Sequence, residues 1–343
     1  MEKERGVGRK PPSRGVMGCL AAGFEIVGQN PFLVALPVAL DLFLWLGPRI
    51  SVGPLVDTVV DFLTVQMPAQ GEAASRVTQA TGLMREFGAE FNLVSVAGGV
   101  PLLQVPSLFV RRISGGSPLG APSVYPLMNP LTVVPWWALL ALMGLGLGFL
   151  YLNEIAHRVG GTATAVKDGL PEASKDAGGA GGGAAVGGVL KLLHFLLFAV
   201  GLLIIGLTVV PLWLFVVALG TMIAEPLGIL LWMGGAGLLG YVGVHLVFVV
   251  PSILLGQRSL PQAIGESVVL SHLNLWPLFG LLALSLVIYE GLGYAWSLPA
   301  DDSWILTVGI LGNAAVATGL TSAAFVFYRE RRNAVRRIAK PEG

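Results

Sequence analysis

Four polar side chains fall inside long apolar stretches of the sequence: Asp41, His245, Glu290 and Asn313. Burying an ionisable group in a membrane without a partner costs several kcal/mol, so such residues are functional candidates. Asp41 and His245 each lie roughly 15 Å from the same end of their apolar stretches, at 1.5 Å per helical residue. This matching depth predicts that they pair in a site that responds to a proton or a ligand. There are two alternatives. Each side chain finds its hydrogen-bond partners locally, or Asp41 lies nearer to the membrane surface than this count places it.

The other two candidates are weaker. Glu290 is close to Tyr289, Tyr294 and Trp296, residue types that favour the membrane surface, so we expect it at an interface. Asn313 is a polar companion to the ionisable groups. The four histidines are scattered without metal-ligand spacing, and no nucleophile or phosphate-loop motif occurs. We therefore expect no metal, no cofactor and no enzymatic activity.

Composition indicates lipid as the main solvent of this chain. Of its 343 residues 54% are hydrophobic and only 12% are charged, against about 25% charged in an ordinary soluble domain. The surplus apolar surface must face lipid. With a net charge of +1 there is no general electrostatic attraction for nucleic acid. The expected partners are membrane lipids, with a second membrane protein as the other kind of partner considered.

Six stretches approach the ~20 apolar residues that a helix needs to cross a bilayer. They are Pro31–Leu46, Leu131–Tyr151, Val189–Leu219, Pro226–Leu255, Leu273–Trp296 and Trp304–Tyr328. The first is short. The fold expected is all-α, a polytopic transmembrane bundle of about six spans with interfacial amphipathic helices and an external helical hairpin.

These spans divide the chain into five parts. Residues 1–30 are a basic tail with an interfacial helix, and residues 31–47 are the first span. Residues 48–130 form an extracytoplasmic segment, and 131–328 a five-span bundle with a glycine-rich linker near 171–188. Residues 329–343 are a second basic tail.

The distribution of positive charge predicts the orientation. The two tails hold more than half of the chain's 21 Lys and Arg, and such loops stay in the cytoplasm. The connections at 220–225 and around Asp301 and Asp302 have no Lys or Arg and are expected outside. We therefore predict an inner (plasma) membrane protein with both termini cytoplasmic. The arginines of residues 50–130 conflict only weakly, because long segments translocate largely regardless of charge.

The long external segment has two apolar stripes at helical spacing. Val77, Met84 and Phe87 belong to one, and residues 55–63 carry the other, with Met67–Gly71 as the turn. This pattern predicts a helical hairpin. Residues 94–110 form an apolar run broken by Gly and Pro, which we interpret as an interfacial or re-entrant piece.

Shorter patterns predict surface helices and close helix packing. Met17, Leu20, Phe24 and Val27 share one face of a helix before the first span. The pair Gly144 and Gly148 is a small-xxx-small motif, typical of close backbone approach. We expect it to serve packing within the chain, rather than a dimer interface.

Three short segments resemble a loose group of bacterial multi-span proteins, which includes the membrane domain of certain glycerophosphodiester phosphodiesterases. They are Asn30–Phe32, Leu260–Ser267 and Phe327–Arg329. The resemblance implies a six-span bundle with interfacial helices and no hydrolase activity, since the soluble catalytic domain is missing. Residues 50–130 depart from that pattern.

Two functions are therefore expected. The first is a non-enzymatic structural, assembly or accessory component that acts on a partner through its outer hairpin and basic tails. The second is a transporter or lipid-handling permease with a polar intramembrane site around Asp41 and His245.

Overall fold

The protein is seen in a computed structural model that describes residues 14–66, 72–98, 103–110, 112, 116–165 and 181–339. Almost all of this is helix. The elements are α1 (Val16–Gln29), η1 (Pro31–Val34), α2 (Ala35–Leu46), β1 (Arg49–Ser51), α3 (Gly53–Gln66), α4 (Glu72–Glu90), η2 (Leu93–Gly98), β2 (Val124–Pro126), α5 (Pro130–Ala165), α6 (Gly181–Ile223), α7 (Glu225–Leu246), α8 (Val249–Leu254), α9 (Leu260–Leu273), α10 (Leu275–Trp296) and α11 (Leu306–Ala339). The two short strands pair in parallel, with Arg49 opposite Val124.

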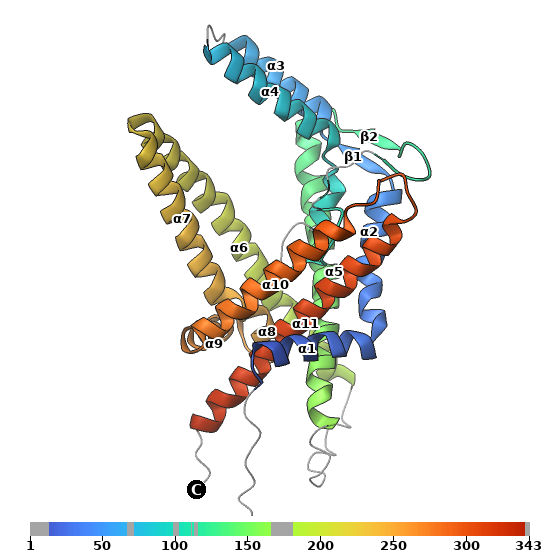
Figure 1. The fold of residues 1–343 in the computed structure, drawn as a ribbon, viewed down its shortest axis with the longest axis vertical. Helices are drawn as coiled ribbons and strands as arrows, with labels where there is room; N and C mark the ends of the chain where they lie inside the picture. The colour runs from blue at the N-terminus through green and yellow to red at the C-terminus, as the bar shows by residue number, and fades with distance from the viewer. Residues whose placement is uncertain are drawn as a thin grey trace, which may run out of the picture.

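Long apolar helices make up the body of the molecule (Figure 1). Five segments are long and apolar enough to cross a membrane: α5, α6, α7 with α8, α10 and α11. A sixth is reached if the bent pair formed by α1 and η1–α2 counts as one. The predicted all-α multi-span membrane fold is confirmed. We call the end with α3 and α4 the hairpin end, and the end with α1, α9 and the last turns of α11 the tail end.

The chain bends by 96° between α1 and the η1–α2 segment. Pro31 has no backbone N–H to continue the helix, and the Asn30 side chain donates to the Ile26 carbonyl over 2.9 Å. The predicted interfacial helix exists as α1, but part of its apolar face is buried in the protein. Leu20 and Val27 are buried while Met17 is 70% exposed.

Helix α1 packs across α11 because small residues let the two backbones meet. A Cβ at Gly23 would lie 2.4 Å from the Gly319 carbonyl oxygen and 2.7 Å from the Ala323 Cβ. The N-terminal helix is thereby fixed to the last span.

Helices α6 and α7 form an antiparallel arm that touches the other helices mainly at the tail end (Figure 1). Trp213 and Trp232 stack at 4.7 Å and hold the two helices together. None of the most apolar window of α6 is buried within the chain, as expected for lipid-facing surface. Helix α6 begins at Gly181, so residues 181–188 of the predicted linker are helical, and 171–180 lie outside the described residues.

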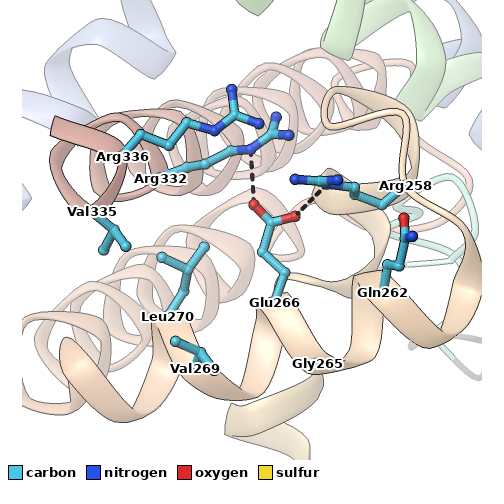
Figure 2. A pocket seen from close by; sticks show the side chains of 9 residues that line it. All are labelled: Arg258, Gln262, Gly265, Glu266, Val269, Leu270, Arg332, Val335 and Arg336. Carbon is cyan, nitrogen blue, oxygen red and sulfur yellow. Dashed lines mark ion pairs between the residues drawn. The ribbon is translucent and has the colours of Figure 1, made fainter. Parts of the chain in front are cut away.

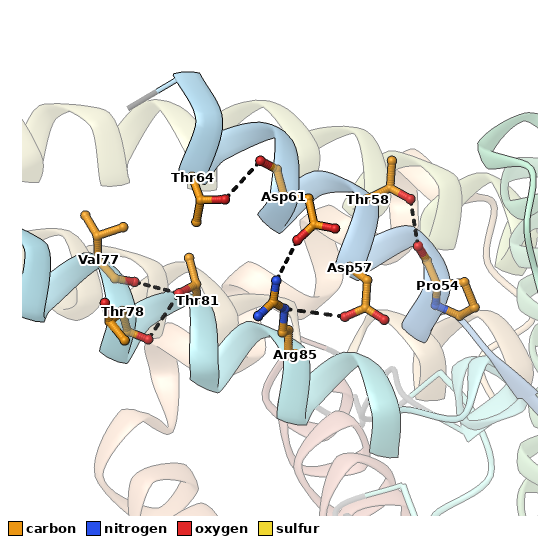
Figure 3. A network of polar contacts seen from close by, with 9 residues as sticks. All are labelled: Pro54, Asp57, Thr58, Asp61, Thr64, Val77, Thr78, Thr81 and Arg85. Atoms are coloured by element: carbon orange, nitrogen blue, oxygen red, sulfur yellow. Dashed lines mark hydrogen bonds and ion pairs between the residues drawn. The ribbon is translucent and has the colours of Figure 1, made fainter. Parts of the chain in front are cut away.

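The predicted hairpin is present as α3 and α4. Arg85 on α4 bridges two carboxylates of α3, at 2.6 Å to Asp61 and 3.6 Å to Asp57 (Figure 3). The predicted turn 67–71 lies outside the described residues. Much of the hairpin's apolar surface stays uncovered, with Phe62 63% and Phe87 50% exposed.

Many residues of the described parts of region 93–110, which are 93–98 and 103–110, are buried within the protein. Buried residues of this segment include Leu93, Ala97, Leu103, Val105 and Leu108. The interpretation as a re-entrant piece is supported for its described part, and we call residues 103–110 the re-entrant segment. Re-entrant backbone at membrane depth occurs only where protein surrounds it.

Gly144 and Gly148 of α5 make room for this segment. A Cβ at Gly144 would lie 2.3 Å from the Ala97 carbonyl oxygen, and one at Gly148 would lie 2.0 Å from that of Leu103. The motif serves packing within the chain, as predicted, against the short helix η2 at Gly144 and against the re-entrant segment at Gly148.

Gly148→Ala is expected to destabilise the protein by about 1–3 kcal/mol, because the new methyl group overlaps the Leu103 carbonyl. Gly146→Ala is the matched control, since nothing lies within 4 Å of a Cβ there, and it should be neutral or stabilising by about 0.5–1 kcal/mol. Thermal unfolding in detergent measures both. Equal melting temperatures for the two variants would contradict the packing described.

Candidate intramembrane site

The Asp41 carboxylate holds the re-entrant segment in place. Asp41 is fully buried in α2. It accepts hydrogen bonds from the Leu108 N–H at 3.1 Å, from the Phe109 N–H at 3.3 Å and from the Ser107 hydroxyl. The Ser107 oxygen in turn accepts from the Val110 N–H at 3.2 Å. One side chain therefore accepts the hydrogen bonds of two successive backbone N–H groups and of the hydroxyl before them.

Asp41 and His245 are not brought together. Nδ1 of His245 lies 2.9 Å from the carbonyl oxygen of Tyr241, one turn earlier on α7. Helices α2 and α7 lie on opposite sides of the structure (Figure 1). The predicted pair is wrong, because equal depth along two helices does not make them neighbours. The alternative of local satisfaction describes His245.

Serines of α9 also position the end of α7 that carries His245. Ser267 donates to the His245 carbonyl over 2.6 Å and accepts from the Phe248 N–H at 3.1 Å. Ser271 donates to the Val244 carbonyl over 3.2 Å. These bonds satisfy backbone groups that the break between α7 and α8 leaves open, which is a structural role.

A cavity of about 540 Å³ lies between α5, α10, α11 and the re-entrant segment. Its size is within the range of small-molecule sites. The lining is mostly aliphatic, including Leu152, Leu282 and Leu320. Ser107 lines the cavity and also donates to Asp41, so Asp41 stands directly behind the cavity wall.

The lining also includes polar residues from the re-entrant segment, α5, α10 and α11: Gln104, Ser107, Tyr151, Ser285, Tyr289, Glu290 and Thr321. Glu290, a candidate residue for which an interfacial position was expected, is exposed and belongs to the lining. Tyr151 is buried and donates to the Thr318 hydroxyl over 3.0 Å. A mostly apolar space with a few polar groups suits an amphipathic molecule.

The lining of the cavity reaches the surface of the helix bundle. Leu286 lies near the middle of α10, belongs to the lining and is 58% exposed.

Asn313, the fourth candidate, lies on α11 away from the cavity lining. It is 2% exposed, and its side-chain nitrogen has no hydrogen-bond partner among the described residues. Of the four candidates, Glu290 lines the cavity and Asp41 lies behind its wall. His245 and Asn313 are not among the lining residues. Gln104 and Ser107 were missed, because an uncharged polar residue in a loop has no distinctive sequence signal.

An ion pair joins the chain after the re-entrant segment to the connection between α10 and α11. Arg112, which follows the re-entrant segment, lies 2.7 Å from a carboxylate oxygen of Asp301 and donates to the Pro299 carbonyl over 2.7 Å. The Trp45 indole donates to the Asp301 carbonyl over 2.8 Å. Burial lowers the pKa of the neighbouring Arg49, and the charge of Asp301 opposes that shift. The segment is thus tied to α2 and to the connection between α10 and α11.

Within the described ranges, no group of three or more His, Cys, Asp and Glu side chains is placed to hold a metal ion. Comparison with family models, with curated proteins and with solved structures gives no match. The resemblance to the phosphodiesterase membrane domain stays a prediction.

Asp41→Ala is expected to cost about 3 kcal/mol of stability, because it leaves two buried N–H groups without an acceptor. Hydrogen exchange at Leu108 and Phe109 should accelerate together with the drop in melting temperature. Ser107→Ala removes one donor to Asp41 and the acceptor of the Val110 N–H, and it should cost about 1–2 kcal/mol.

Asp302→Ala is the control for Asp41→Ala, since Asp302 is exposed and surface changes stay within about 0.5 kcal/mol. If Asp41→Ala were as mild as this control, the carboxylate would not hold the segment.

Proposed function

We propose that this chain is a non-enzymatic membrane protein that binds and handles a lipid or another membrane-dissolved amphiphile. The cavity between α5, α10 and α11 carries the proposal. Its lining combines many aliphatic side chains with a few polar ones, among them Gln104, Tyr289 and Glu290. A chain-like apolar ligand with a small polar group matches this lining.

The exposed part of the lining favours a lipid over a water-soluble solute. Leu286 brings the lining to the surface of the bundle near the middle of α10, where a spanning helix contacts hydrocarbon. The re-entrant segment forms one wall of the cavity.

A second candidate is the accessory role, in which the chain assists another membrane protein. The observation that favours it is the α6–α7 arm, whose apolar surface is covered by little of this chain. Exposed aromatic residues such as Phe215 and Trp232 would contact either lipid or a partner helix.

Ser285→Phe is expected to fill the cavity and reduce co-purified lipid about tenfold. Val287→Phe is the matched control, because Val287 is 68% exposed on the same helix and does not line the cavity. Native mass spectrometry of the protein in mild detergent counts bound lipid per chain. Equal lipid in both variants would contradict the cavity as the site, and a stoichiometric polypeptide in place of lipid would favour the accessory role.

We also propose that the tail end faces the cytoplasm of a plasma membrane. The described basic residues at this end include Arg158, Arg258, Arg332 and Arg336, and positive charge favours the cytoplasmic side. At the hairpin end, Arg85 and Arg112 are balanced by aspartates.

Single cysteines in a Cys19→Ala background report the orientation. Thr64→Cys on α3 should react with an impermeant maleimide in intact cells, and Asn333→Cys on α11 only after permeabilisation. Both positions are exposed. The reverse pattern would overturn the proposed orientation, and labelling of both positions in intact cells would contradict it as well.

A further inference from the structure

A second pocket lies at the tail end, where α9 meets the last turns of α11 (Figure 2). Its volume is about 460 Å³. Arg258 enters from the connection between α8 and α9, and Arg332 and Arg336 come from α11 (Figure 2). Three guanidinium groups thus line one small space.

One carboxylate orders two of these arginines. Glu266 on α9 lies 2.8 Å from Nε of Arg332 and 3.4 Å from Nε of Arg258. Ser252 donates to the same carboxylate over 2.8 Å. The ion pairs use the Nε side of each guanidinium, and the fork of Arg332 also reaches the Gly256 carbonyl at 3.2 Å.

The pocket carries a surplus of positive charge. Three guanidinium groups face one carboxylate among the residues that line it. Arg332 and Arg336 are also four residues apart on one helix, a spacing at which like charges repel. An anion bound between them would remove this repulsion and accept charge-assisted hydrogen bonds.

The opposite side of the pocket is apolar. Val269, Leu270 and Val335 belong to its lining, and Val269 is 52% exposed. The outer face of α9 continues this surface with Ile264 and Val268, which are 37% and 41% exposed. Such a face belongs at the boundary between hydrocarbon and headgroups, so the pocket lies at headgroup level.

We propose that this pocket binds a phosphate group, as carried by the headgroup of an anionic phospholipid or by free inorganic phosphate. Arginine forks match phosphate oxygens, and the valines and Leu270 offer contacts for the first carbons of a lipid. The site is separate from the cavity between α5, α10 and α11, and it does not depend on the function proposed for that cavity.

The test is ligand-dependent stabilisation of the full chain in a neutral detergent. Phosphatidylglycerol, phosphatidylcholine and inorganic phosphate are titrated in parallel while the melting temperature is recorded. Phosphatidylglycerol is expected to raise the melting temperature and phosphatidylcholine to leave it unchanged. Arg336→Gln and Arg258→Gln should each weaken the apparent affinity about tenfold, the effect of losing one charge-assisted contact.

A further variant separates phosphate binding from the general effect of losing an arginine. Arg158→Gln removes a partly exposed arginine at the same end, paired with Glu154 at 2.8 Å, and should leave the affinity unchanged.

Each outcome decides the proposal. Stabilisation by phosphatidylglycerol alone, lost in Arg336→Gln, supports a lipid headgroup, and the same pattern with inorganic phosphate supports the free ion. Equal responses to both lipids, or equal losses of affinity in Arg336→Gln and Arg158→Gln, would overturn it. A failure here leaves the lipid count of the Ser285→Phe experiment unaffected, so the two proposals fail separately.

Discussion

The hydrogen bonds from residues 107–109 to the Asp41 carboxylate are the constraint on which the rest of the bundle depends. Backbone N–H groups at membrane depth need an acceptor, because hydrocarbon offers none. Asp41 supplies one for both Leu108 and Phe109. The segment in turn fills the space beside Gly144 and Gly148 of α5 and forms a wall of the cavity. A charged residue that looks functional in the sequence therefore acts first by positioning backbone.

The tail end is held together differently, by small residues and shared ion pairs. Close contact at Gly23 and Gly319 fixes α1 on α11. Glu266 then joins α9 to α11 through Arg332, and to the preceding connection through Arg258. Exposed ion pairs contribute little to stability, but Arg332 and Glu266 are only 13% and 18% exposed, so these interactions are screened less by water. The connection between α8 and α9 is set by the same cluster.

The features that the sequence predicted correctly are those that depend on the local composition of the chain. Apolar length identified the spans, and two helical stripes identified the α3–α4 hairpin. Long-range partners could not be predicted, since Asp41 meets a segment 66 residues away whose Ser107 has no distinctive signal. Matching depth led to the wrong pair of Asp41 and His245, because depth does not say which helices are neighbours. Periodicity also failed to show that α1 packs on α11, where glycines decide the contact.

Helix α11 lines both the cavity and the arginine pocket, which fixes their separation along this helix. Ala324 belongs to the first and Arg332 to the second, and at 1.5 Å per residue they are roughly 12 Å apart along the axis. One leaflet contributes about half of a 30 Å hydrocarbon core. The acyl chains of a lipid with its phosphate at Arg332 would therefore be long enough to reach the level of the cavity. If both proposals hold, the arginines would bind the charged headgroup and the cavity an apolar chain, so the two sites would bind different parts of one class of molecule.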